Sequence, residues 1–141
     1  VDIDTGEVTV IKSVGAHDVG QSINLRAVEG QIEGSALMGQ GFALSEELIL
    51  EKGVLKNGSF SEYLIPTSED VPEIESIVLE SRSGLGPFGS KGIGEPVFAP
   101  VAASIVNAVA DAIGTRIHDL PLTPEKVLAA VNAKQTQEAA E

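Results

Sequence analysis

The chain has 141 residues, a formal net charge of −12 from 9 basic and 21 acidic residues, and no cysteine. This length supports one ordinary hydrophobic core and predicts a single domain. The acidic charge argues against a surface that binds nucleic acid or anionic membranes. The absence of cysteine excludes disulfides, thiolate metal ligands and a cysteine nucleophile from this chain. No uninterrupted apolar run reaches about 18 residues and no signal peptide is visible, so we expect a soluble, cytoplasmic protein.

The first residues predict a β-hairpin. Val1–Asp4 and Val8–Val14 read as strands around the turn-forming residues Asp4-Thr5-Gly6-Glu7, and His17–Gly20 closes the second strand. The chain does not begin with Met and its first residues already read as strand, so we expect a subunit fragment or a processed piece.

A glycine-rich helix follows the predicted hairpin. Asn24 is a suitable N-cap for a helix from Leu25 to about Ala43. Each glycine inside a helix costs up to ~1 kcal/mol relative to alanine, and this helix contains four of them, Gly30, Gly34, Gly39 and Gly41. We therefore expect another backbone or a cofactor to come close to it.

The rest of the chain predicts two strands and two helices. Strands are expected at Leu48–Leu55 and Ile74–Glu80, with a loop crossing between them at Phe60–Pro72. Val97–Ile113 is apolar almost all round, which is typical of a buried helix, and Gly114 is a natural C-cap. Thr123-Pro124-Glu125 begins the last helix, and the tail from Lys134 lacks large apolar residues and is expected to fray. These elements predict an α+β domain over residues 1–133, with a small mixed or antiparallel sheet, about three helices and a disordered tail at 134–141.

The segment Gly84–Pro96 is the strongest candidate for chemistry. It reads GLGPFGSKGIGEP, with Glu95 where a glycine-rich loop meets the start of an apolar helix. Glycines let backbone N–H groups approach a ligand closely, and a helix N-terminus favours anions. The segment matches GxGxxG, but no helix follows directly, and its Gly-Ser-Lys order fails the phosphate-loop template. A generic phosphate-binding nest remains consistent with both failures.

Other short motifs carry less weight. The Asp-Thr-Gly triplet at residues 4–6 fits a turn better than an aspartic protease, because no second copy exists. His17 and His118 are about a hundred residues apart and have no metal-ligand spacing, so no protein metal ligand is expected.

Four segments in order carry a family resemblance. They are GQIEGSALMGQGFALSEE (30–47), FSEYLIPTSEDVP (60–72), GSKGIGEPVFAPVAASIVNAVADAIG (89–114) and LPLTPEKVLAA (120–130). Together they resemble the C-terminal part of the molybdopterin-binding large subunit of the xanthine dehydrogenase and aldehyde oxidase family of molybdenum hydroxylases. The resemblance implies that the chain is part of a larger molybdopterin-binding domain.

The resemblance implies specific roles for residues. Glu95 corresponds to the general base that activates the molybdenum-bound hydroxide as it attacks an electron-poor carbon of the substrate. Gln31 corresponds to a residue on the pterin side of the cofactor, and Ser90, Lys91, Gly92, Ile93 and Gly94 to cofactor contacts. The cofactor is molybdopterin with molybdenum, in its plain form or as the cytosine dinucleotide.

The resemblance also implies partners and leaves three functions open. The remaining large-subunit segments and the iron–sulfur and flavin modules are expected on other domains or subunits. Oxidative hydroxylation of an N-heterocycle or aldehyde is favoured, with a xanthine-type purine as the first substrate. The alternatives are another family member, such as nicotinate or carbon monoxide dehydrogenase, and a non-catalytic module that binds a phosphate-bearing ligand.

Overall fold

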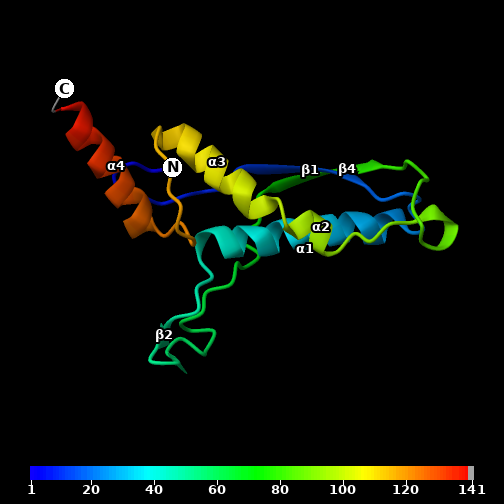
Figure 1. The fold of residues 1–141 in the computed structure, drawn as a ribbon, viewed down its shortest axis with the longest axis horizontal. Coiled ribbons are helices and arrows are strands. Elements are labelled where there is room, and N and C mark those ends of the chain that lie inside the picture. Colours follow the sequence, from blue (N-terminus) through cyan, green and yellow to red (C-terminus); the bar gives the residue numbers. More distant parts are fainter. Residues whose placement is uncertain (140–141) are drawn as a thin grey trace.

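A pair of parallel strands and a long helix organise the molecule. The computed structural model describes residues 1–139. Strand β1 (Lys12–Asp18) pairs in parallel with β4 (Glu73–Leu79), so that Lys12 lies opposite Glu73 and Asp18 opposite Leu79. Parallel neighbours need a long crossover, and here it consists of the helix α1 (Leu25–Leu44) and the segment that follows it. Figure 1 shows α1 running alongside the strand pair.

The sequence predicted α1 and β4 well, but the predicted N-terminal hairpin is wrong. Asn24 caps α1 as expected, because its Oδ1 accepts a hydrogen bond from the Ala27 N–H at 3.1 Å. A turn does form near residue 5, where the Asp2 N–H donates to the Glu7 carbonyl at 2.8 Å. The flanking segments do not pair, however, because Val8 and Val10 pack against the helical core and β1 pairs with β4 instead.

The segment between α1 and β4 forms an arm. The predicted strand at residues 48–55 is a small antiparallel hairpin of β2 (Leu50–Glu51) and β3 (Val54–Leu55). Residues 60–72 contain no helix or strand, as predicted. Figure 1 shows this arm extending away from the body of the molecule.

Three helices follow β4 and the glycine loop. They are α2 (Glu95–Phe98), α3 (Val101–Ile113) and α4 (Pro124–Glu138). The main core joins the end of α1 to α3 and α4 through buried residues that include Ala43, Ile105 and Val127. Gly39 allows the close approach of α3 to α1, because a Cβ at this position would overlap the Val101 side chain. Gly114 ends α3 with φ of +69°, as expected for a C-cap.

Two expectations about the C-terminal half need correction. The predicted buried helix is two helices, because Pro100 has no N–H to continue the ladder, and only Val97, Ile105, Val109 and Ile113 of it are buried. Glu95–Ile113 is also long and apolar enough to cross a membrane by length and composition, a test that core helices of soluble proteins pass as well. The predicted disordered tail is helical as far as Glu138, and residues 140–141 lie outside the described part of the chain.

Candidate functional site

The first half of the glycine loop packs upon itself. The Gly84 N–H donates to the Gly89 carbonyl and the Gly86 N–H to the Ser90 carbonyl, both at 3.2 Å, around a short 3-10 turn at Pro87–Gly89. A Cβ on Gly84 or Gly86 would overlap the backbone of Gly89 or Ser90. Gly89 itself has φ of +80°. These glycines are therefore required by the loop's own structure.

The second half of the loop has no such internal requirement. Neither Gly92 nor Gly94 has positive φ, and a Cβ at either position would meet no atom within 4 Å. Within residues 1–139, the backbone N–H groups of residues 92–95 donate no hydrogen bond. Four consecutive donors are thus free beside two positions without side chains, which is the donor set that an oxygen-rich ligand requires.

Glu95 is the last of the four residues with a free backbone donor. It is the first residue of α2, which packs against α1, and it is exposed in this chain. Its carboxylate accepts no hydrogen bond from a side chain or backbone group of residues 1–139. The structure therefore leaves this carboxylate available to a substrate or cofactor.

The other predicted site residues lie in different environments. Gln31 is exposed on α1, and its Nε2 donates a long hydrogen bond of 3.4 Å to Ser35 Oγ. Ser90 Oγ donates to the Pro87 carbonyl at 2.8 Å, and Ile93 is half-buried. Lys91 Nζ lies 2.6 Å from Asp18 Oδ2, so its charge is already paired within the chain.

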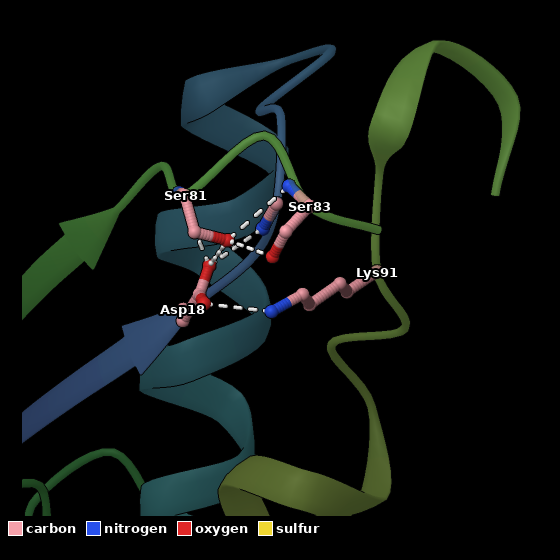
Figure 2. A network of polar contacts seen from close by, with 5 residues as sticks. Asp18, Ser81, Ser83 and Lys91 are labelled. Atoms are coloured by element: carbon pink, nitrogen blue, oxygen red, sulfur yellow. Dashed lines mark hydrogen bonds and ion pairs between the residues drawn. The ribbon is translucent and has the colours of Figure 1, made fainter. Parts of the chain in front are cut away.

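Asp18 is a residue that the sequence pattern did not assign to the site. It is the last residue of β1, and its Oδ1 accepts hydrogen bonds from the Gly20 N–H at 2.9 Å and from Ser81 Oγ at 2.9 Å. Figure 2 shows Lys91 reaching Asp18 from the glycine loop while Ser81 approaches from the end of β4. The sequence does show a carboxylate at the carboxyl end of a predicted strand. Its contact with Ser81 could be predicted only if the pairing of β1 with β4 were known.

Two further observations limit the chemistry of this chain. Among residues 1–139, no group of three or more His, Cys, Asp or Glu side chains is placed to hold a metal ion. An apolar groove of about 540 Å³ lies between the segment around Val10, α1 and α3, and none of the predicted site residues lines it. The groove and the glycine loop are therefore separate features.

The comparisons with known proteins identify the family and the fold of this chain. Residues 1–72 match the family model of the molybdopterin cofactor-binding domain. The chain is 41% identical over 129 residues to the putative xanthine dehydrogenase molybdenum-binding subunit XdhA of Escherichia coli (strain K12), covering 90% of this chain and 17% of that protein. It thus spans about one sixth of the length of this relative.

Solved structures give the same result. Quinoline 2-oxidoreductase from Pseudomonas putida 86 superposes with a TM-score of 0.84 and 36% identity, covering 94% of this chain and 17% of that one. The aldehyde oxidoreductase from Desulfovibrio desulfuricans ATCC 27774 superposes with a TM-score of 0.85 and 38% identity. This match covers 92% of this chain and 14% of that one. The fold is therefore that of a molybdopterin cofactor-binding domain, mixed α and β. The chain belongs to the xanthine dehydrogenase and aldehyde oxidase family of molybdenum hydroxylases and is part of a molybdenum-binding subunit.

Proposed function

We propose that the complete protein hydroxylates an N-heterocycle or an aldehyde oxidatively, and that this chain forms one wall of its active site with Glu95 as the general base. One observation carries the proposal. The free N–H groups of residues 92–95 and the bare backbone at Gly92 and Gly94 immediately precede an exposed, unpaired carboxylate. Ligand-holding donors and a proton acceptor thus lie within four residues.

The residues present fit a molybdopterin cofactor. Its phosphate and pterin groups present oxygen and nitrogen acceptors, which free backbone N–H groups satisfy. A Cβ at Gly92 or Gly94 would enter space where, apart from the adjoining residues, no atom of residues 1–139 lies within 4 Å. When bound, the cofactor supplies the redox centre of the hydroxylation. Its plain and cytosine dinucleotide forms are both compatible with this donor set.

Each predicted residue then has a role that its surroundings support. Gly92, Ile93 and Gly94 hold the cofactor through their backbone N–H groups. Gln31 offers its amide from the exposed face of α1 to the pterin side, because its contact with Ser35 is long. A Glu95 carboxylate oxygen takes up the proton lost as the substrate is hydroxylated, a step that general bases typically accelerate about 10²- to 10⁴-fold.

The engaged side chains of Ser90 and Lys91 support a narrower role than the sequence predicted. Ser90 Oγ is bonded to the Pro87 carbonyl and Lys91 Nζ to Asp18, so each of these side chains already has a partner within the chain. We propose that both residues contribute to cofactor binding chiefly through the backbone and through the shape of the loop.

A xanthine-type purine is the first substrate to test. The E. coli relative is described as a xanthine dehydrogenase subunit, and the similar solved structures act on quinoline and on aldehydes by their names. Nicotinate and carbon monoxide remain the alternatives within the family. Iron–sulfur clusters are held by cysteine thiolates, and this chain has no cysteine, so this proposal assigns them to other domains or subunits. The flavin is assigned there by family resemblance, and we propose that the enzyme is soluble and cytoplasmic.

Metal analysis and turnover of the complete native protein test this proposal. We expect about one molybdenum per large subunit and reduction of an artificial dye with xanthine, quinoline or an aromatic aldehyde. A complex that binds a phosphate-bearing ligand but contains no molybdenum would instead support the non-catalytic binding module. Molybdenum without turnover of any of these substrates would direct the search to nicotinate and carbon monoxide.

A further inference from the structure

The first part of the glycine loop, up to Lys91, is hydrogen-bonded to the residues that follow β1. The Lys91 N–H donates to the Val19 carbonyl at 2.9 Å, and the Gln21 N–H donates to the Gly89 carbonyl at 3.1 Å. At the other end, the Arg82 N–H donates to the Gly20 carbonyl at 3.0 Å. Residues 82–91 are therefore held at both ends by one short segment, residues 19–21.

The Asp18 side chain contacts residues from each of these hydrogen-bonded segments. Its Oδ1 accepts hydrogen bonds from Gly20 and Ser81, and its Oδ2 pairs with Lys91 Nζ at 2.6 Å. We call Asp18, Gly20, Ser81 and Lys91 the Asp18 clasp (Figure 2). Ser83 extends it, because its Oγ lies 2.8 Å from Ser81 Oγ. The end of β4 and the glycine loop thus meet on one carboxylate from β1, which is more than sixty residues away in sequence.

The clasp is built around an ionised carboxylate. The hydrogen bond from Lys91 is the main cause that holds the pKa of Asp18 below its ordinary range, with the Gly20 N–H and the Ser81 hydroxyl acting in the same direction. Both charged side chains are about one third exposed, so solvent screens their attraction. The Asp18–Lys91 ion pair therefore contributes little to the free energy of unfolding, and its main effect is to fix the position of Lys91.

Lys91 is the last residue of the loop that is hydrogen-bonded to the β1 end before the four residues with free backbone donors. Its backbone is bonded to Val19 and its side chain to Asp18, whereas the backbone N–H groups of residues 92–95 have no acceptor in the described part of the chain. Lys91 is therefore the fixed point from which Gly92–Glu95 extend. If Lys91 lost its contact with Asp18, the backbone N–H groups of residues 92–95 and the Glu95 carboxylate would shift together.

We propose that Asp18 is a positioning residue for the active site, which acts through Lys91 to fix the place of the cofactor-binding donors and of Glu95. This inference rests on the proposed function of the same loop. It assigns the Lys91 ammonium to the clasp and not to a direct contact with the cofactor. A displacement of about 1 Å at a catalytic group can lower the rate as much as 10²-fold, so an indirect contact of this kind has a measurable effect.

The test is a double-mutant cycle in the complete enzyme. Asp18→Asn keeps an acceptor for Gly20 and Ser81 but removes the charge that holds Lys91, and Lys91→Met removes the ammonium. We measure molybdenum content, melting temperature, KM and kcat per molybdenum for the single and double variants. Lys12→Met is the matched control, because Lys12 pairs with Glu73 and Glu75 at the opposite end of the same strand.

The clasp predicts that both single variants lower kcat per molybdenum by about 10- to 100-fold with KM changed less than about twofold. The double variant should be no worse than either single variant, because each removes the same contact. Lys12→Met should keep the wild-type kcat. Lys91→Arg should recover a large part of the activity lost in Lys91→Met, since it restores a cation opposite Asp18.

Other outcomes overturn the inference in distinct ways. If Lys91→Met loses molybdenum while Asp18→Asn retains it, Lys91 is a direct cofactor ligand. If melting temperature or expression falls while kcat per molybdenum stays normal, Asp18 has only a structural role. Should Asp18→Asn fail to fold, the Lys91→Met and Lys91→Arg pair still decides between these results. A wild-type enzyme without molybdenum would contradict the proposed function instead, whatever the variants show.

Discussion

Individual glycines of the loop have different physical reasons to be glycine. Gly84 and Gly86 prevent overlap with the loop's own backbone, and Gly89 adopts positive φ. Gly92 and Gly94 satisfy neither condition, because each has ordinary φ and no neighbouring atom within 4 Å of the place that a Cβ would occupy. The absence of an internal reason supports an external one, a cofactor held close to this backbone.

Valine substitutions separate these two groups of glycines. In the complete enzyme, Gly92→Val and Gly94→Val should lower molybdenum occupancy while the melting temperature of the cofactor-free protein stays near wild type. Gly84→Val is the control and should lower that melting temperature as well, because its side chain meets the backbone of Gly89 and Ser90. Full occupancy and normal activity in both Gly92→Val and Gly94→Val would contradict the proposal that the cofactor lies close to the backbone at these two glycines.

The sequence selected candidate site residues without their contacts. Glycine spacing and the following apolar helix selected the loop and Glu95, and the family resemblance added Gly92 and Gly94 as cofactor contacts. These assignments stay predictions. The partner of Lys91 was not predictable in this way, because Asp18 is 73 residues away and its position depends on strand pairing. Local chemistry can be read from the chain, whereas side-chain pairing between distant segments requires the fold.

Among the elements, local signals again succeeded and long-range ones failed. The capping residue Asn24 and the apolar periodicity placed α1 correctly, and Gly114 correctly ended α3. The parallel pairing of β1 with β4 was missed, because Asp4-Thr5-Gly6 indicated a nearby hairpin and nothing local indicates a partner sixty residues later. The position of the loop depends on this pairing, since it brings Ser81 beside Asp18.

The link between β1 and the loop should depend on pH in a defined direction. The pKa of Asp18 is held below its ordinary value of about 3.9, so the carboxylate contributes stability above that value and loses it as pH falls through the lower, folded pKa. The melting temperature of wild type minus that of Asp18→Asn should therefore be constant from pH 8 to pH 5 and decrease below about pH 4. A difference that already shrinks between pH 7 and pH 5.5 would contradict the ionised clasp.

The chain leaves many large apolar side chains exposed to solvent. Large apolar side chains are exposed on the arm and on the loop tip, including Leu50, Phe60, Leu64, Leu85 and Phe88. The chain spans about one sixth of the length of its E. coli relative. Large exposed apolar side chains gathered in this way on the arm are typical of surfaces that contact another chain segment or protein.

The isolated chain should therefore be incomplete in function. We expect it neither to bind molybdenum tightly nor to turn over substrate, because four free backbone donors are too few to hold a large polyanionic cofactor. Purification of the chain alone, followed by metal analysis and a dye-reduction assay, measures both properties. Stoichiometric molybdenum or hydroxylase activity in this preparation would show that the chain is a self-sufficient unit.

The most direct test of the account is the turnover rate per molybdenum of Glu95→Gln in the complete enzyme. Glutamine keeps the shape and volume of Glu95 but cannot accept the proton, and the exposed carboxylate has no partner within residues 1–139 whose loss would destabilise the fold. Molybdenum content and melting temperature should stay near wild type while turnover falls by at least about 10²-fold. A near-normal rate per molybdenum, with or without a small loss of stability, would show that Glu95 is not the general base.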